Sequence, residues 1–423
     1  MIDYEALLHR EVAPALGCTE PIAVAYTAAW AAKTLGAPVE KIHVLGSRNI
    51  LKNAMSVGIP GSGMAGLPIA AALGALGGDV ERGLEVLDGI TQEQVAQGKQ
   101  MIANGQITVA QKTNVEALYI EVTVSGGEHS ATAIVRQKHT QLTELSRDGV
   151  VLLHQDVAAT EKAADTLEGM TVQDIFQFCK TVPVESISFL MDGVQMNLRV
   201  GEEGLHGGYG MSVGHNLASG LNSQLLGSDI GSIAVATTAA ACDARMAGAP
   251  LPVMSVAGSG NQGVVCTVPV AVFAQKSHAS DELLLRAIAL SDLITIHLKR
   301  GIGRLSALCG CGIAAAVGAS CGILLILGGS ERQIEYTIKN MAANITGMVC
   351  DGAKSGCAVK VATAVSAAVQ CAVLAMNNVY TPSIDGIVDR NVEKTIANMG
   401  HVGRDGMAQA DQVILDMMTA KIS

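Results

Sequence analysis

The chain has 423 residues, which is enough for two or three domains and excludes a short disulfide-stabilised scaffold. Its 28 basic and 38 acidic residues give a net charge of −10, without a basic run long enough to bind phosphates, so nucleic acid is not an expected partner. Hydrophobic residues make up 49% and aromatic residues only 3%, with 47 glycines, a composition that favours tightly packed, largely buried helices.

The first 95 residues are predicted to form helices separated by glycine-rich turns. The apolar spacing predicts helices over residues 4–16 and 21–35, followed by further helix up to about residue 96. Residues 46–66 form a predicted loop rich in glycine, which either presents backbone N–H groups to an anion or only forms a turn. The N-terminus carries acidic side chains where a signal peptide needs a basic stretch and an apolar run, so we expect a cytoplasmic protein.

The pattern changes in the middle of the chain. Apolar and polar residues alternate over 118–124 and 131–136, with a glycine-containing turn between them, which predicts a β-hairpin. Helices are predicted after the hairpin over 172–180 and 184–197. Together these elements predict a small α/β domain over about residues 96–200.

From about residue 204 the chain returns to alanine- and glycine-rich segments that predict helices. Glycine-rich loops are expected between them at residues 204–214, 258–263 and 347–356. The fold class predicted from these patterns is α+β. It consists of a mainly α-helical catalytic domain made of residues 1–95 and 201–423, with a smaller α/β domain of residues 96–200 inserted.

Residues 305–330 contain no charged side chain, and about 20 apolar residues are the length of a membrane span. Glycines at positions 310, 312, 318 and 322 and three cysteines interrupt this segment, and the sequence has no series of comparable segments with basic flanking loops. We therefore predict a buried central helix here and expect no membrane partner.

Two groups of closely spaced residues stand out among the ten cysteines. One is Cys309-Gly310-Cys311, and the other runs from Cys350 to Cys357. In a reducing compartment such thiols are metal ligands, catalytic groups or buried side chains rather than disulfides. Thiolates on glycine-containing turns can converge on a soft metal or an iron–sulfur cluster, with zinc and ordinary buried thiols as the alternatives.

At these residues the chain resembles a known family. Four segments carry the resemblance: LGCTEP at 16–21, GSGNQG at 258–263, LCGCG at 308–312 and MVCDG at 348–352. They are similar to those of the L-cysteine desulfidases, which belong with the iron–sulfur L-serine dehydratase α-chain superfamily. The resemblance covers nearly the whole chain, and the four motifs occur in the order that the family has.

The resemblance implies an enzyme that uses a four-iron, four-sulfur (4Fe–4S) cluster and not pyridoxal phosphate. Three cysteines would hold the cluster and leave the fourth iron open. Carried over to this chain, the ligands are Cys311, Cys350 and Cys357, with Cys309 as the alternative third ligand. An open iron can act as a Lewis acid on a bound leaving group.

The function implied is β-elimination of L-cysteine to pyruvate, ammonia and sulfide, in which an enzyme base removes the α-proton. The candidate base is Cys18, which lies where the serine dehydratases carry a histidine and which a helix N-terminus or a cationic cluster could ionise at neutral pH. Its alternative roles are packing and cluster ligation. L-serine dehydration by the same mechanism is the alternative function, and a non-catalytic metal-binding or sensing protein is the alternative from another class.

A small L-amino acid substrate needs polar groups that bind its carboxylate and amine. The candidates are polar or cationic side chains at the start of the second predicted helix and in the glycine-rich loops, although each could equally be a turn or structural residue: Thr19, Arg48, Asn53, Ser62, His206, Ser259 and Asn261. The mean hydropathy of +0.37 favours a homo-oligomer, in which a partner subunit covers part of the apolar surface.

Overall fold

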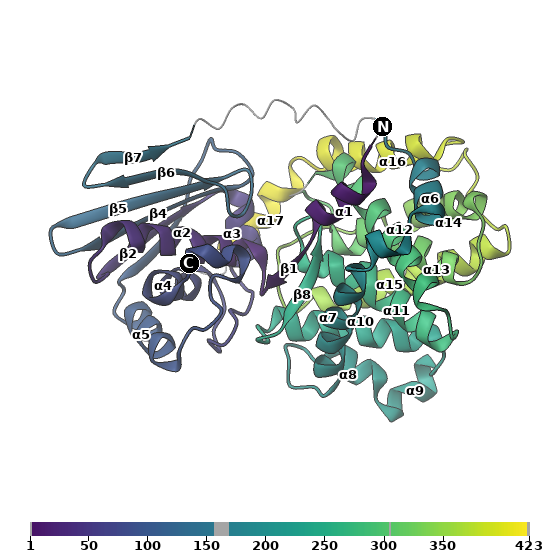
Figure 1. Ribbon diagram of the computed structural model, residues 1–423, viewed down its shortest axis with the longest axis horizontal. Helices are drawn as coiled ribbons and strands as arrows, with labels where there is room; N and C mark the ends of the chain where they lie inside the picture. Colours follow the sequence, from purple (N-terminus) through teal and green to yellow (C-terminus); the bar gives the residue numbers. More distant parts are fainter. Residues whose placement is uncertain (1, 156–168, 304–305, 421–423) are drawn as a thin grey trace.

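The structure is a computed structural model that describes residues 2–155, 169–303 and 306–420. Figure 1 shows two lobes side by side, a smaller α/β lobe and a larger helical lobe. Each lobe has its own cluster of buried hydrophobic side chains. The predicted fold class is confirmed, because the chain is mainly helical and carries one α/β part.

A six-stranded sheet in the order β3-β2-β4-β5-β6-β7 forms the centre of the α/β lobe. Its strands are β2 (Lys41–Gly46), β3 (Ile107–Gln111), β4 (Tyr119–Gly126), β5 (His129–Arg136), β6 (Leu142–Arg147) and β7 (Val150–His154). β2 and β3 are parallel and the other neighbours antiparallel. The predicted hairpin is confirmed, since β4 pairs with β5 from Tyr119 opposite Arg136 to Gly126 opposite His129.

Helices from the first hundred residues accompany this sheet (Figure 1). They are α2 (Thr19–Leu35), α3 (Arg48–Ala54), α4 (Leu67–Gly77), the short 3-10 segment η1 (Val80–Glu85) and α5 (Gln92–Ala103). α2 packs on β4, β5 and β6, where the alternating residues Ile120, Val122 and Val124 are buried. Residues 46–66 are predicted to be a loop, but they contain the helix α3, whose N-cap is Ser47.

The packing of the two cores differs from the predicted division at residues 96 and 200. The core of the α/β lobe combines side chains from Ile22 to Val135, because β2 is an interior strand and α2 covers the sheet. Beyond residue 169, α6 (Val172–Thr181), the 3-10 segment η2 (Val184–Ile187) and α7 (Leu190–Leu205) pack into the core of the helical lobe instead.

The rest of the helical lobe is built from helices around one hydrophobic core. Its remaining elements are α1 (Tyr4–Glu11), β1 (Val12–Leu16), α8 (Val213–Ala218), α9 (Gly220–Leu226), α10 (Ile230–Met246), β8 (Pro252–Val256), α11 (Gly260–Lys276), α12 (Asp281–Ile302), η3 (Cys311–Ala315), α13 (Ala316–Ile326), α14 (Glu331–Ile345), α15 (Cys357–Met376), α16 (Val392–His401) and η4 (Val402–Gly406). The last helix, α17 (Ala410–Thr419), returns to the α/β lobe and packs against α3.

The predicted buried central helix is confirmed for the described part of that segment, because every residue of α13 except Leu325 is buried. Among the described helices, α15 is the one long and apolar enough to cross a membrane by composition. Half of its most apolar stretch is buried inside the protein, as in the core helix of a globular lobe.

The predicted helix over residues 4–16 is instead a helix followed by a strand. α1 ends at Glu11, and β1 pairs antiparallel with β8, from Val12 opposite Val256 to Leu16 opposite Pro252. A proline at position 14 cannot donate a helical hydrogen bond, whereas the edge of a two-stranded ribbon accepts it. β1 carries the chain to the start of α2, where it enters the α/β lobe (Figure 1).

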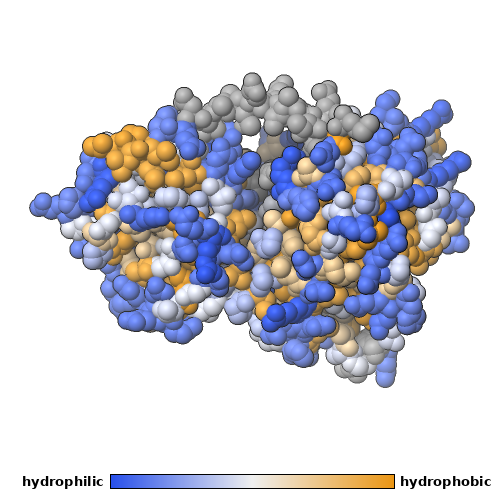
Figure 2. All heavy atoms as spheres, viewed as in Figure 1, coloured by the Kyte–Doolittle hydropathy of each residue, from blue (hydrophilic) through white to orange (hydrophobic). Residues whose placement is uncertain are grey.

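One surface of the α/β lobe is apolar. The edge strand β7 exposes Val150, Val151 and Leu152, which are 62%, 55% and 60% exposed, and Figure 2 shows apolar side chains gathered on this part of the lobe. Exposed apolar edge strands are common sites of association between chains. The homo-oligomer expected from the composition stays a prediction.

Candidate active site

A cavity of about 500 Å³ lies where the two lobes meet. Side chains of both lobes line it. From the α/β lobe and the start of α2 come Cys18, Thr19, Glu20, Asn53, residues 116–118 and residues 137–139. From the helical lobe come Arg245, residues 257–259, Asn261, Gln262, Lys299, Ser306, residues 308–311, residues 350–353, Cys357 and Lys360.

Four of the cysteines named from the sequence line this cavity together, because two loops of the helical lobe run side by side. The Cys309 N–H donates to the Met348 carbonyl at 2.9 Å, and the Cys350 N–H donates to the Ala307 carbonyl at 2.7 Å. The Sγ atoms of Cys309 and Cys311 are 3.5 Å apart. The two cysteine groups, distant in sequence, therefore line the same cavity.

Helix starts and glycines shape the cysteine loops. Cys311 is the first residue of η3, and Cys357 is the first residue of α15, whose N-terminal N–H groups favour negative charge. A side chain at Gly312 would place its Cβ 2.3 Å from the Met348 Sδ and 3.1 Å from the Cys309 Sγ. Only glycine at position 312 lets these loops approach so closely.

The four thiols differ in acidity. The hydrogen bond from Cys311, helped by the Gly312 N–H and the charges of Lys360 and Lys299, lowers the pKa of Cys309 to about 7 despite its burial. Burial raises the pKa of Cys350 and raises that of Cys357 to about 11. Cationic lysines beside a group of thiols offset the negative charge that these side chains gain as thiolate ligands.

A second constellation lies at the start of α2. Cys18 is the N-cap residue of this helix, and Glu20 lies in its first turn. The carboxylate of Glu20 accepts hydrogen bonds from the Cys18 Sγ at 3.1 Å, the Thr19 Oγ1 at 3.0 Å and the Asn53 Nδ2 at 3.1 Å. Three predicted site residues, Cys18, Thr19 and Asn53, therefore converge on a carboxylate that the sequence reasoning did not select.

The pKa values of Cys18 and Glu20 differ from the expectation that Cys18 could ionise at neutral pH. Burial and the charge of Glu20 raise the pKa of Cys18 well above its usual value, and the nearby Arg245 only partly opposes them. Burial by itself would raise the pKa of Glu20. The charge of His139 and the hydrogen bonds from Cys18 and Thr19 outweigh the effect of burial, so the pKa of Glu20 is lower than its usual value. The resting pair is a thiol that donates to a carboxylate.

Arg245 brings a buried positive charge to the cavity. It is 4% exposed, its Nη1 donates to the Asn261 Oδ1 at 2.9 Å, and its Nη2 donates to the Gly17 carbonyl at 2.7 Å. Gly260 lies against the guanidinium, since a Cβ there would be 2.3 Å from the Arg245 Nε. Asn261, in the first turn of α11, is thus held by Arg245, and its neighbour Ser259 also lines the cavity.

Two buried acceptors in the cavity wall have no hydrogen-bond donor among the described residues: the Asn53 Oδ1 and the Gln262 Oε1. Both side chains are less than a tenth exposed. A buried polar atom without a partner is costly unless a ligand or water satisfies it. These acceptors mark the cavity as a place built for a molecule with hydrogen-bond donors.

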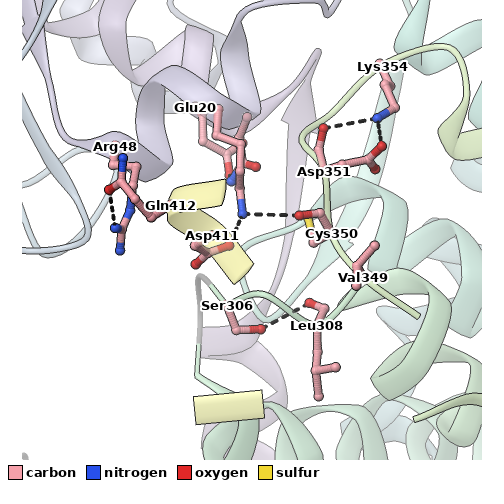
Figure 3. A network of polar contacts seen from close by, with 12 residues as sticks. Glu20, Arg48, Ser306, Leu308, Val349, Cys350, Asp351, Lys354, Asp411 and Gln412 are labelled. Carbon is pink, nitrogen blue, oxygen red and sulfur yellow. Dashed lines mark hydrogen bonds and ion pairs between the residues drawn. The ribbon is translucent and has the colours of Figure 1, made fainter. Parts of the chain in front are cut away.

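The structure places the other three predicted substrate-binding residues elsewhere. Arg48 donates to the Gln412 Oε1 of α17 at 2.9 Å, as Figure 3 shows, and Ser62 donates to the Ile59 carbonyl at 2.8 Å within its own turn. His206 is an exposed residue at the end of α7. Loop composition selected these side chains, but the backbone turns them away from the cavity.

Among the charged cavity residues that the sequence analysis missed are Glu20, Arg245, Lys299 and Lys360. Each lies within a helix rather than in a glycine-rich loop. Arg245 follows a run of alanines, and a charge inside such an apolar helix is rarely buried without a partner or a role. That pattern is the sequence signal that could have identified it.

Comparison with known proteins identifies the family and the relatives of this chain. The sequence model of the serine dehydratase alpha chain family matches residues 81–416. The chain is 48% identical over 419 residues to a UPF0597 protein of Oleidesulfovibrio alaskensis, covering 99% of this chain and 98% of that one. It is 48% identical over 418 residues to one of Bacteroides fragilis, covering 98% and 97%, and 42% identical over 418 residues to one of Clostridioides difficile, covering 97% and 98%.

The family match indicates a lyase-like enzyme of the dehydratase type. The chain belongs to the serine dehydratase alpha chain family. Within that family it is similar over nearly its whole length to UPF0597 proteins.

Proposed function

We propose that the protein catalyses iron–sulfur-dependent β-elimination of L-cysteine to pyruvate, ammonia and sulfide. The observation that carries the proposal is that the four loop cysteines, Cys18 and the buried Arg245 all line one cavity. Membership of the serine dehydratase alpha chain family supports a lyase reaction on a small β-substituted amino acid. The alternative substrate is L-serine, which differs only in its leaving group.

The thiols fit an iron–sulfur cluster better than a single metal ion. Within the described residues, no three Cys, His, Asp or Glu side chains converge as the ligands of one ion do. In an iron–sulfur cluster each cysteine binds a different iron, so the ligands need not meet at one point. Cys311, Cys350 and Cys357 would hold a 4Fe–4S cluster, with Cys309 as the alternative third ligand.

When bound, the cluster supplies a Lewis acid that compensates the charge of the departing group. This chemistry does not require pyridoxal phosphate. Lys299 and Lys360, whose charges act on Cys309, offset the negative charge of the ligands. A cytoplasmic location belongs to the proposal, because a reducing compartment keeps cysteines as thiols and all ten in this chain are unpaired.

The cavity wall offers complementary groups to a zwitterionic amino acid. Arg245 and the N–H groups at the start of α11, next to Ser259, can bind the substrate carboxylate. The acceptors Asn53 Oδ1 and Gln262 Oε1 can bind the ammonium group. Asn261 keeps Arg245 in place, and Thr19 orders the carboxylate of Glu20.

Cys18 is the proposed base that removes the α-proton. It lines the cavity at the N-terminus of α2, and burial of its surroundings keeps competing water away from the transferred proton. In the serine dehydratases that this chain resembles, a histidine stands at this place. A thiol base and soft sulfur ligands favour cysteine over serine as the substrate.

The test compares pyruvate release from L-cysteine and L-serine by anaerobically reconstituted protein, with sulfide measured in parallel. We expect turnover of L-cysteine with equal amounts of pyruvate and sulfide, and at least about a 100-fold loss in Cys18→Ala, the typical contribution of a positioned base. Faster turnover of L-serine would support the alternative substrate. Full iron content without turnover of either substrate would support a non-catalytic sensor.

A further inference from the structure

Glu20 is the nearest proton acceptor to Cys18, and its geometry is fixed on both oxygens. Its Oε2 accepts from the Cys18 Sγ at 3.1 Å and from the Thr19 Oγ1 at 3.0 Å, while its Oε1 accepts from the Asn53 Nδ2 at 3.1 Å. The residue is 8% exposed and lines the cavity. The carboxylate is therefore ordered, buried and aimed at the thiol that the proposed reaction uses as its base.

The thiol as it stands cannot act as a base, because it carries a proton. Cys18 can accept a second proton only while it passes on its own, and the described groups near it differ in what they can accept. Arg245 is a cation without an acceptor, and Thr19 already donates to Glu20. His139 acts on the carboxylate of Glu20, whose negative form its charge favours. This leaves Glu20 in direct hydrogen-bond contact as the acceptor.

We propose, on the basis of the proposed elimination, that Glu20 takes the proton of Cys18 and later returns it to the leaving group. In the same step the Cys18 sulfur takes the α-proton of the substrate, so no free thiolate forms beside the carboxylate. The electrons of the broken C–H bond form the Cα=Cβ double bond, and sulfide leaves with the electrons of the broken C–S bond. The proton held by Glu20 goes to the sulfide, so both residues end in their starting protonation states.

The rival role for Glu20 is purely structural. An acidic residue in the first turn of α2 favours the helix dipole, and it would merely hold Cys18 as a thiol. The two roles predict opposite effects for Glu20→Gln, which removes the negative charge but keeps the shape. A structural carboxylate suppresses the thiolate, so its removal would raise turnover. A proton acceptor is required, so its removal lowers turnover.

The experiment measures two quantities on iron-loaded wild type, Glu20→Gln and Glu20→Asp. The first is the rate at which iodoacetamide alkylates Cys18, followed by mass spectrometry of its peptide between pH 6 and pH 10. The second is pyruvate release from L-cysteine. We expect Glu20→Gln to alkylate faster near neutral pH, because the adjacent negative charge is gone, while its kcat falls by about 100-fold or more.

Glu20→Asp keeps a carboxylate on a shorter side chain and should recover part of kcat, which shows that the loss in Glu20→Gln is not a folding defect. Equal or higher turnover in Glu20→Gln, together with faster alkylation, would overturn the proposal. Loss of turnover in Glu20→Gln with alkylation unchanged from wild type would also overturn it, because Glu20 would then not interact with the thiol. If wild type itself releases no pyruvate, the proposed function fails instead, and the alkylation rates still report the contact.

Discussion

The buried ion pair between Lys52 and Asp411 gives the sharpest stability prediction. The Lys52 Nζ lies 2.5 Å from the Asp411 Oδ1 and 3.3 Å from the Cys350 carbonyl oxygen, and the two side chains are 1% and 11% exposed. Figure 3 labels both acceptors of the lysine, Asp411 of α17 and Cys350 of the loop before α15, which lie close to each other. One lysine thus joins α3 of the α/β lobe, the C-terminal helix and the cysteine loop.

Lys52→Met leaves the carboxylate of Asp411 buried without its partner, which typically costs about 3–5 kcal/mol. Asp411 becomes solvated when α17 separates from α3, which removes the cost of its burial. The substitution therefore lowers the free energy needed to separate α17 from α3. At about 1.4 kcal/mol per factor of ten, hydrogen exchange of the α17 amides should rise by about 100-fold or more. Mass spectrometry of peptides from residues 410–419 measures this exchange.

The matched control is Arg48→Ala, which removes an exposed contact between the same two helices, the hydrogen bond to Gln412. An exposed hydrogen bond is worth about 0.5–1.5 kcal/mol, so exchange should change by about tenfold at most. The double variant Lys52→Met with Asp411→Leu removes both charges and should recover most of the docking. Exchange in Lys52→Met that matches the Arg48→Ala control would refute the reasoning.

Two further predictions concern the buried residues Asp292 and Gly312. Burial raises the pKa of Asp292 to about 8 from 3.8, so the folded state holds a proton that the unfolded state releases. The free energy of unfolding should therefore fall as pH rises between these two values, by up to about 1.4 kcal/mol per pH unit. Urea unfolding at pH 6 and pH 8 measures this fall, which Asp292→Asn should abolish. The same fall in wild type and Asp292→Asn would contradict the prediction. Gly312→Ala places a methyl group 3.1 Å from the Cys309 Sγ and should cut the iron bound on reconstitution by more than half. Gly347→Ala, where a Cβ meets nothing within 4 Å, is its control, and equal iron content in both variants would contradict the steric argument.

The sequence predicts local elements with strong periodicity and misses those that depend on distant partners. The β4–β5 hairpin and the buried α13 follow from alternation and from uncharged composition. β1 is five residues long, and its partner β8 lies more than 200 residues away, so local pattern extends the preceding helix through it. β2 does alternate buried and exposed residues, a signal that would have moved the start of the α/β region toward the N-terminus.

The candidate site follows the same division. Cysteine spacing on glycine-containing loops predicts that Cys309, Cys311, Cys350 and Cys357 meet, because glycine lets short loops turn toward a common point. Loop composition does not specify which way a side chain points, so it selects Arg48 although this residue contacts α17. Burial of charges within helices is decided by tertiary packing, which is why Lys299 and Lys360 emerge only from the fold.

Pyruvate formation per chain from L-cysteine, measured anaerobically on protein that carries about four irons and four sulfides, tests the central claim most directly. The account predicts repeated turnover by wild type and none by Cys311→Ala, whose iron content should fall with its activity. Cys371→Ala, which alters a buried thiol in α15 outside the cavity, should keep both iron and turnover. Iron-loaded wild type that forms no pyruvate, or a Cys311→Ala variant that is as active as wild type, would contradict the account.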